Sequence, residues 1–175
     1  MDVAAGASAA IRDLGPAVYG YLCLMLDEDD ARDVFSQWSE DLWRGLPGFR
    51  RECTLRAWAF RLAWHAMARH LRDPYRARGE RLPTSAASRL AASVAAASSA
   101  LPGGRRDQLR KLRETLPPED QTLLHLRIDK ELEWEEIASV LADGVAGTSA
   151  ATLRKRFERL KARLAKLARE EGLLG

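Results

Sequence analysis

An aromatic and basic stripe runs along one side of the segment Thr54–Arg72. On a helical wheel it lies opposite the apolar side, at spacings i, i+3, i+7, i+11 and i+14, and consists of Trp58, Arg61, His65, Arg69 and Arg72. Arginine pairs with phosphate and tryptophan stacks on an unpaired base, so the stripe suits a nucleic acid. The alternative is a solvated basic face with Trp58 half-buried against a neighbouring helix, and the stripe alone favours neither interpretation.

A second basic helix is expected after the run DGVAGTS, with Thr148 or Ser149 as its N-cap. Its apolar stripe is formed by Leu153, Phe157, Leu160, Leu164 and Leu167. The opposite side carries Ala151, Lys155, Glu158, Arg159 and Ala162, flanked by Thr152, Arg154 and Arg156. The short helix EWEEIASVLA precedes it. A short helix, a turn and a longer basic helix form the order of a helix-turn-helix, in which the second helix enters the major groove.

The residues that usually carry catalysis or hold metals do not form recognisable patterns. Cys23 and Cys53 form no CxxC pair, and His65 and His70 do not share a helix face, which argues against zinc and against a disulfide framework. The sequence lacks a Gly-rich phosphate loop and an HExxH motif. His125 lies among leucines and is expected to be structural. We therefore expect no enzyme activity, no metal and no cofactor.

The composition predicts an all-α chain that positions these two basic helices. The chain has 175 residues, of which 46% are hydrophobic and 30% charged. Good helix formers dominate, and neither apolar/polar alternation nor hairpin turns indicate strands. The start of the chain does not resemble a signal peptide, and the run VYGYLCLML is too short to span a bilayer. We expect a soluble cytoplasmic protein without membrane insertion.

Two helical modules joined by a linker are expected. Helices of the first module should cover Ala7–Leu26, interrupted near Gly15-Pro16, then Asp29 or Asp30 to Arg44, and then Thr54–Arg72. The second should contain Gln108–Leu116, a helix opened by Pro117-Pro118 with Leu123, Leu126 and Ile128 facing inward, and the two helices described above. In between, the 21 residues Thr84–Gly104 include eight alanines and five serines, too little large apolar surface for a core. The domains predicted are 1–78 and 107–175, with 79–106 as a flexible Ala/Ser-rich linker.

Charge is distributed in blocks along the chain. Residues 1–50 have 4 basic and 9 acidic side chains, whereas residues 51–106 have 11 and 3. The pattern repeats, with 5 basic and 10 acidic side chains in 107–147 and 8 and 3 in 148–175. Two basic segments on separate modules suggest two contacts with a polyanion, which leaves the acidic segments to meet a protein. Chance clustering on helical surfaces is the alternative.

Three motifs in this order resemble the extracytoplasmic-function (ECF) group of bacterial RNA polymerase sigma factors. They are DDARDVFSQWSEDLWRGLPGF, TLRAWAFRLAWHAMARHLR, and the run from LRETLPPEDQ to LRKRFERLKARL. The resemblance covers nearly the whole chain except the linker and the first few residues. The sequence departs from the family pattern by Ser36 in place of the usual glutamine, by His65 and Arg69 in the second motif, by Glu131 in place of a glycine, and by a longer turn before the last helix.

The resemblance implies a role for each motif. The first would dock on the clamp helices of the polymerase β′ subunit through Asp30, Asp33, Gln37, Asp41 and Trp43. The loop with Phe49, Arg50 and Arg51, together with the Trp58, Arg61, His65, Arg69 and Arg72 stripe, would capture and read the minus-ten element. The last helix would read the minus-35 element through Ser149, Ala151, Thr152, Arg154, Lys155, Arg156 and Arg159. The linker would thread into the polymerase channels.

A sigma factor without catalysis of its own is therefore the leading hypothesis. Its partners would be core RNA polymerase and promoter DNA, and an anti-sigma factor is a further partner that the resemblance leaves open. The first alternative is a sigma-like interaction protein that has lost polymerase binding, and the second is a stand-alone helix-turn-helix regulator. The acidic first module argues against the regulator, which would not need a surface for docking on polymerase.

Overall fold

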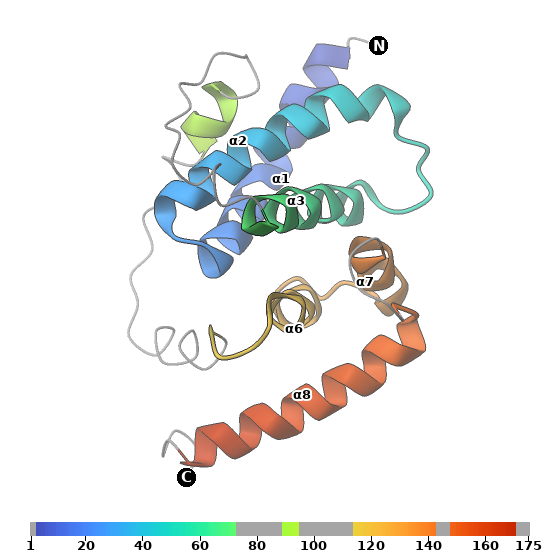
Figure 1. Ribbon diagram of the computed structural model, residues 1–175. Helices are drawn as coiled ribbons and strands as arrows, with labels where there is room; N and C mark the ends of the chain where they lie inside the picture. Colours follow the sequence, from blue (N-terminus) through green and yellow to red (C-terminus); the bar gives the residue numbers. More distant parts are fainter. Residues whose placement is uncertain (1–2, 73–88, 95–113, 143–147, 171–175) are drawn as a thin grey trace. The chain divides into compact units, whose positions relative to one another are not determined.

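The computed structural model describes residues 3–72, 89–94, 114–142 and 148–170 (Figure 1). Helices account for most of these residues and no strand occurs among them, which confirms the all-α prediction. The chain divides into two compact units, residues 1–101 and 102–175. The domain boundaries expected from the sequence, at residues 78 and 107, stay a prediction.

Helix α1 (Val3–Met25) runs through Pro16 without a break, so the interruption expected near Gly15-Pro16 is wrong. A proline inside a helix lacks an amide donor and crowds the preceding turn. Here Pro16 and Arg12 are exposed, so water can reach the carbonyl group that loses its partner. Ile11 and Val18 are fully buried on either side of Pro16, and their packing holds both halves of the helix in line.

Helix α2 (Glu28–Gly45) begins at a polar cap. The side chain of Asp27 accepts a hydrogen bond from the backbone N–H of Asp30 at 2.9 Å, and three acidic residues follow in the first turn. Both features stabilise the positive end of the helix dipole. A 3₁₀ turn, Leu46–Gly48, ends the helix. The predicted bounds of this helix differ from the observed ones by one or two residues at each end.

Helix α3 (Leu55–Arg72) starts immediately after Thr54, whose Oγ1 accepts a hydrogen bond from Ala57 N at 3.1 Å. The predicted N-cap is therefore confirmed. Helix α3 is also tied to α2, because the indole Nε1 of Trp38 donates to the carbonyl oxygen of Ala59 at 2.9 Å. Trp38 is fully buried, so this bond satisfies an indole donor that water cannot reach.

Aromatic rings form the centre of the first unit. Phe35 and Trp38 of α2 are stacked, with ring centroids 5.0 Å apart, and Tyr19 of α1 lies 5.2 Å from Phe35. Tyr21 of α1 meets Phe60 of α3 edge to face at 5.9 Å. All three helices therefore contribute rings to one core, and this packing fixes which sides of α2 and α3 face outward.

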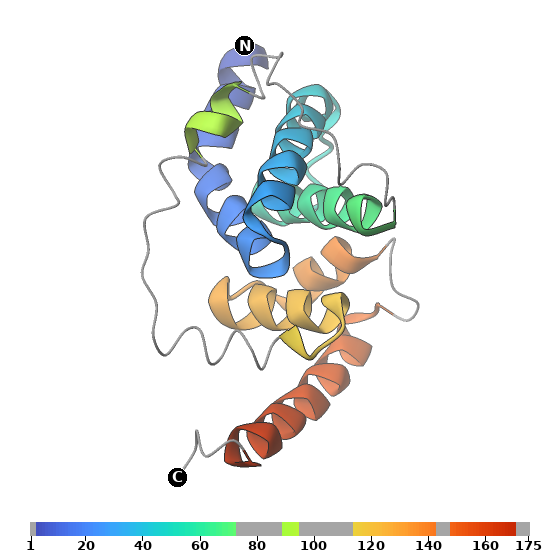
Figure 2. The same ribbon diagram turned by 60° about the vertical axis from the view of Figure 1, so that its left-hand side comes forward.

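Residues 89–94 are helical and lie against α1, as Figure 2 shows for the light-green segment. Ala91 and Val94 are 1% and 9% exposed. The sequence predicted a flexible linker over 79–106, and for these six residues that expectation is wrong. An alanine and a valine one turn apart give the segment a small apolar face, which is sufficient because α1 offers a matching site at Gly15. The rest of the predicted linker lies outside the described residues.

The second unit contains three described helices and one π-helical turn. In chain order they are α6 (Pro118–Leu124), the turn His125–Asp129, α7 (Trp134–Leu141) and α8 (Ala150–Glu170). Pro118 opens α6 as predicted. Most of the helix expected at Gln108–Leu116 lies outside the described residues.

Local caps define where α7 and α8 begin. The side chains of Glu133 and Glu136 form a reciprocal capping box with the backbone at the start of α7. Ser149 Oγ accepts a hydrogen bond from Thr152 N at 3.2 Å, so Ser149 is the cap of α8. Just before α7, Glu131 adopts a left-handed backbone conformation with φ of 55°. The family places a glycine at this position, and the positive φ explains why.

The core of the second unit joins α6, α7 and α8. Its fully or almost fully buried side chains include Leu123, Leu126, Ile137, Leu141, Leu153, Phe157 and Leu160. Ile128 was expected to face inward but is 50% exposed. The π-helical turn explains the difference, because its wider turn rotates residues that follow Leu126 away from the helical register. Leu164 and Leu167 are half-buried.

Candidate protein and nucleic-acid interfaces

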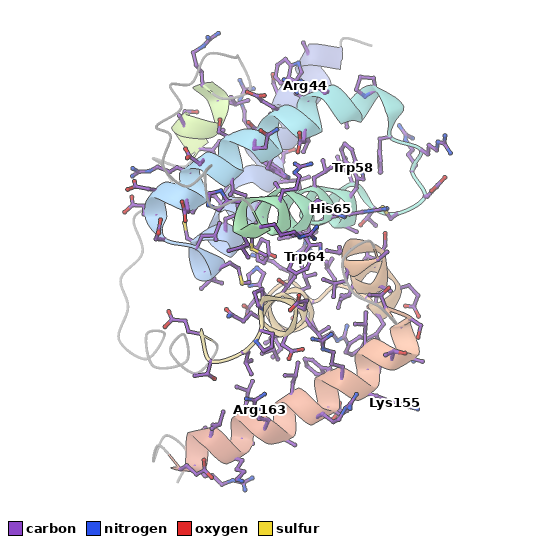
Figure 3. The ribbon with its side chains drawn as sticks, in the orientation of Figure 1. Arg44, Trp58, Trp64, His65, Lys155 and Arg163 are labelled. Atoms are coloured by element: carbon purple, nitrogen blue, oxygen red, sulfur yellow. The ribbon has the colours of Figure 1, made fainter. Side chains whose placement is uncertain are left out.

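Two of the acidic residues singled out on α2 are engaged with α3. Asp30 Oδ1 lies 3.1 Å from Nε2 of His70, and the His70 side chain is 9% exposed. Asp41 Oδ2 lies 2.5 Å from an Arg69 guanidinium nitrogen. Figure 3 draws the side chains that α2 and α3 present to each other. These pairs connect the acidic face of α2 to the basic side of α3.

Asp41 has a second partner on its own helix. Gln37 Nε2 donates to Asp41 Oδ1 at 2.9 Å, and the Asp41 side chain is 21% exposed. Asp33 and Trp43 are also half-buried. We expected Asp33 and Asp41 to be exposed, and that expectation is wrong, because packing against neighbouring elements and polar partners covers part of both side chains. The five predicted docking residues therefore form a partly engaged surface.

Trp58 is packed against the end of α2 and the following turn. Its ring centroid lies 4.9 Å from that of Phe49, and a Cβ atom at Gly45 would lie 3.0 Å from Trp58 Cζ2. The absence of a side chain at Gly45 thus makes room for the indole. Of the two interpretations left open by the sequence, this geometry matches the half-buried one, although part of the indole stays accessible.

The remaining stripe residues of α3 differ in exposure. Arg61 and His65 are half-buried and each has an interaction partner. Arg69 keeps 52% of its side chain exposed despite its ion pair, and Arg72 is exposed. The basic side of α3 is therefore most accessible toward its C-terminal end. Figure 3 labels Trp58 and His65 on this helix.

The loop between α2 and α3 combines one packed ring with exposed cations. Phe49 is half-buried on Trp58, whereas Arg50 and Arg51 are exposed. Arg51 has φ of 58°, the left-handed conformation that glycine tolerates best. This conformation turns the backbone sharply between the turn at Leu46–Gly48 and α3. The loop thus presents two guanidinium groups beside the Phe49–Trp58 pair.

The first turns of α8 expose a polar and basic surface. Ala151, Thr152, Arg154, Lys155 and Arg159 are all exposed. Thr152 Oγ1 lies 2.9 Å from Ser149 Oγ, so the two hydroxyl groups share a proton donor at the start of the helix. Figure 3 shows Lys155 near the N-terminal end of α8 and Arg163 further along the same helix. An exposed helix of this kind can offer cations to phosphate and hydrogen bonds to base edges.

Arg156 does not belong to the exposed surface of α8. Its Nε donates to a carboxylate oxygen of Asp120 on α6, and the two side chains are 29% and 12% exposed. The sequence grouped Arg156 with the DNA-facing residues, and that grouping is wrong. Position on a helical wheel alone could not show this pair, since Asp120 is 36 residues away in the sequence.

An aromatic and basic cluster at the start of α7 was not predicted. The guanidinium of Arg127 lies 4.8 Å from the centroid of Trp134, that of Arg154 lies 5.9 Å from it, and Phe157 packs edge-on at 5.4 Å. Trp134 was expected in the core but is half-buried. The presence of both cations beside one indole holds Arg154 near the N-terminal end of α8.

The described residues offer no alternative chemistry of the metal or membrane kind. They contain no group of three or more His, Cys, Asp or Glu side chains placed to hold a metal ion. Burial raises the pKa of the Cys23 thiol and favours its protonated form. In the described part of the chain, no helix has the length and apolar character needed to cross a membrane.

Comparison with known proteins identifies the first unit. Residues 10–77 match the family model of sigma-70 region 2, which covers most of α1 and all of α2 and α3. The match supports a sigma-70 family member with a role in transcription initiation. Region 2 implies binding to core RNA polymerase and to promoter DNA. Searches of curated proteins and of solved structures gave no significant match.

Proposed function

We propose that this chain is a sigma factor of the ECF type, which directs core RNA polymerase to specific promoters and opens the minus-ten region. The observation that carries the proposal is the sigma-70 region 2 match over the unit built by α1, α2 and α3. The ECF type is supported by the three motifs and their order along the chain. Such a protein acts in the cytoplasm as a polymerase subunit, without catalysis of its own and without a cofactor.

The face of α2 is proposed to dock on the clamp helices of the polymerase β′ subunit. Asp33, Gln37 and Trp43 are half-buried, which leaves part of each side chain available to a partner. Asp30 and Asp41 are held by His70 and Arg69 and would order this face from one side. Partly buried and pre-organised side chains lose little freedom on binding, which favours a specific interface.

The loop after α2 and the exposed end of α3 are proposed to hold the opened minus-ten strand. Arg50, Arg51 and Arg72 are exposed and can meet phosphates. The Phe49–Trp58 pair provides an aromatic surface at the same place. Base–aromatic stacking is worth about 1–3 kcal/mol per base, which offsets part of the cost of unstacking a base.

Helix α8 is proposed to read the minus-35 element. Its N-terminal turns expose Ala151, Thr152, Lys155 and Arg159, and α7 precedes it as the first helix of a helix-turn-helix would. Arg154 would meet a phosphate from its place beside Trp134. Ser149 contributes as the cap that orients the helix, and Arg156 through its bond to Asp120.

Run-off transcription tests the proposal. Purified chain and core RNA polymerase are incubated with fragmented genomic DNA, and transcripts are sequenced from their 5′ ends. Specific start sites that share upstream elements are expected, and core polymerase alone provides the control. Co-elution with core polymerase without specific transcripts would favour a sigma-like interaction protein. Specific DNA binding without co-elution would favour a stand-alone regulator, and either result would overturn the proposal.

A further inference from the structure

The segment 89–94 occupies a site on α1 where that helix lacks a side chain. Gly15 is buried in the middle of α1, and a Cβ atom built there would lie 3.1 Å from Val94 Cγ1 and 3.2 Å from Phe35 Cζ. Both distances are shorter than ordinary van der Waals contact of a Cβ atom. The glycine therefore creates the notch in which Val94 lies, with Phe35 of α2 as its floor.

The segment binds this notch through one apolar face. Ala91 and Val94 are buried and one helical turn apart, whereas Arg89, Ala92 and Ser93 are exposed. Ser93 Oγ donates to Leu90 O at 2.8 Å, a bond within the segment itself. One alanine and one valine bury little apolar area, so a partner with a larger interface can displace the segment.

We propose that residues 89–94 are a latch, which is closed on α1 in the free chain and is released when the chain assembles with core polymerase on a promoter. The inference rests on the proposed function, because a sigma factor requires this part of the chain to thread into polymerase channels. A segment cannot at the same time be threaded and lie in the notch at Gly15. Assembly therefore requires the contact between Val94 and α1 to break.

The latch also sets how much chain connects the two units. With Val94 bound to α1, the connection to Glu114 consists of the 19 residues 95–113. With the latch open, it consists of the 41 residues 73–113 that follow Arg72. At about 3.3–3.6 Å per extended residue, release raises the maximum span from roughly 65 Å to roughly 140 Å. Release is thus the step that lets one chain reach two separated promoter elements.

A disulfide between positions 15 and 94 can lock the latch. A Cβ atom at Gly15 lies 3.8 Å from Val94 Cβ, which is the usual Cβ–Cβ separation of a disulfide. The test uses the full chain with Cys23→Ala and Cys53→Ala, to which Gly15→Cys and Val94→Cys are added. Gly15→Cys alone, in the same background, controls for crowding against Phe35. Each protein is oxidised with copper phenanthroline, and run-off transcription with core polymerase is measured before and after reduction with dithiothreitol.

The latch predicts a redox-dependent loss of transcription in the double-cysteine protein alone. The free chain should crosslink readily, transcription should fall in proportion to the crosslinked fraction, and dithiothreitol should restore it. Core polymerase and promoter DNA added before the oxidant should lower the crosslinking yield. Full transcription by the crosslinked chain would overturn the latch while leaving the proposed function intact. Lack of specific transcripts from the reduced and wild-type chains alike would instead refute the proposed function.

A second variant tests closure without a crosslink. Val94→Asp places a charge in an apolar notch and should open the latch, so trypsin should cleave after Arg89 several-fold faster than in the wild type. Ser93→Asp, at an exposed neighbouring position, is the matched control and should leave the cleavage rate unchanged. Equal cleavage rates in Val94→Asp and the wild type, or failure of the free double-cysteine chain to crosslink, would show that the latch is not closed in solution.

Discussion

Arg69 of α3 and Asp41 of α2 form an ion pair of 2.5 Å, although the sequence assigned them to two different interfaces. Asp41 was expected to meet polymerase and Arg69 to meet DNA. The pair joins the two proposed surfaces, and Gln37 extends it along α2. A substitution at either position therefore alters the other surface as well, so the two positions have to be tested together.

A double-mutant cycle measures this pair. Asp41→Asn, Arg69→Gln and the double variant are unfolded in urea, and the coupling free energy is obtained from the four stabilities. The side chains are 21% and 52% exposed, so solvent screening should limit the coupling to about 0.2–1 kcal/mol. A coupling of zero would mean that the pair does not contribute to stability in solution. A much larger value would mean that the pair is more deeply buried than described.

Glu131→Gly should stabilise the second unit by about 0.5–1 kcal/mol. Glu131 holds φ of 55°, which a glycine adopts without steric cost, although glycine loses more conformational entropy on folding. Thermal unfolding followed by circular dichroism should show a raised melting temperature. Glu131→Ala is the matched control, because it keeps the Cβ atom and should bring no such gain. Equal melting temperatures for both variants would contradict the explanation by backbone strain.

Arg156→Ala and Lys155→Ala should separate a structural from a DNA-binding role on adjacent positions of α8. Loss of Arg156 leaves the carboxylate of Asp120 buried without its partner and should cost about 2–3 kcal/mol of stability. Lys155 is exposed, so its removal should leave stability near normal but weaken binding to a minus-35 duplex by about 1–3 kcal/mol. Urea unfolding and DNA titration on each variant provide both measurements. The reverse outcome would exchange the two roles.

Arg50→Ala and Arg72→Ala should impair promoter opening. Both residues are exposed, so thermal stability and co-elution with core polymerase should be near normal. Permanganate reactivity of minus-ten thymines should fall, and a template with a pre-melted bubble should relieve much of the transcription defect. Arg44→Ala is the matched control, because Arg44 is exposed and basic but lies outside the proposed DNA surface. Wild-type opening in both variants would show that these arginines belong to a solvated face.

Trp43→Ala should weaken docking on core polymerase. Trp43 is half-buried on α2, and aromatic side chains that are partly accessible often carry a large share of binding energy. Gel filtration with core polymerase should show reduced co-elution of the variant while circular dichroism stays unchanged. Glu28→Gln, a change at an exposed position of the same helix, should co-elute like the wild type. Normal co-elution of Trp43→Ala would remove this residue from the docking surface.

The sequence predicted features that depend on neighbours along the chain. Thr54 and Ser149 could be recognised as caps, because an N-cap bonds to the backbone within three residues. It did not predict features that depend on distant contacts. The continuity of α1 through Pro16, the burial of Val94 and the bond from Arg156 to Asp120 each require a partner from another part of the chain. For the same reason, residue types indicated the basic surfaces well, whereas the exposure of individual arginines could not be predicted.

Trp134 gives the second unit an intrinsic optical label. Among residues 102–175 it is the single tryptophan, and it lies at the first position of α7. Two guanidinium groups flank its ring, and one of them belongs to Arg154 at the beginning of α8. Any ligand that draws Arg154 toward a phosphate changes the electric field at the indole and therefore its emission. Occupancy of this one surface can thus be followed by fluorescence without attaching a dye.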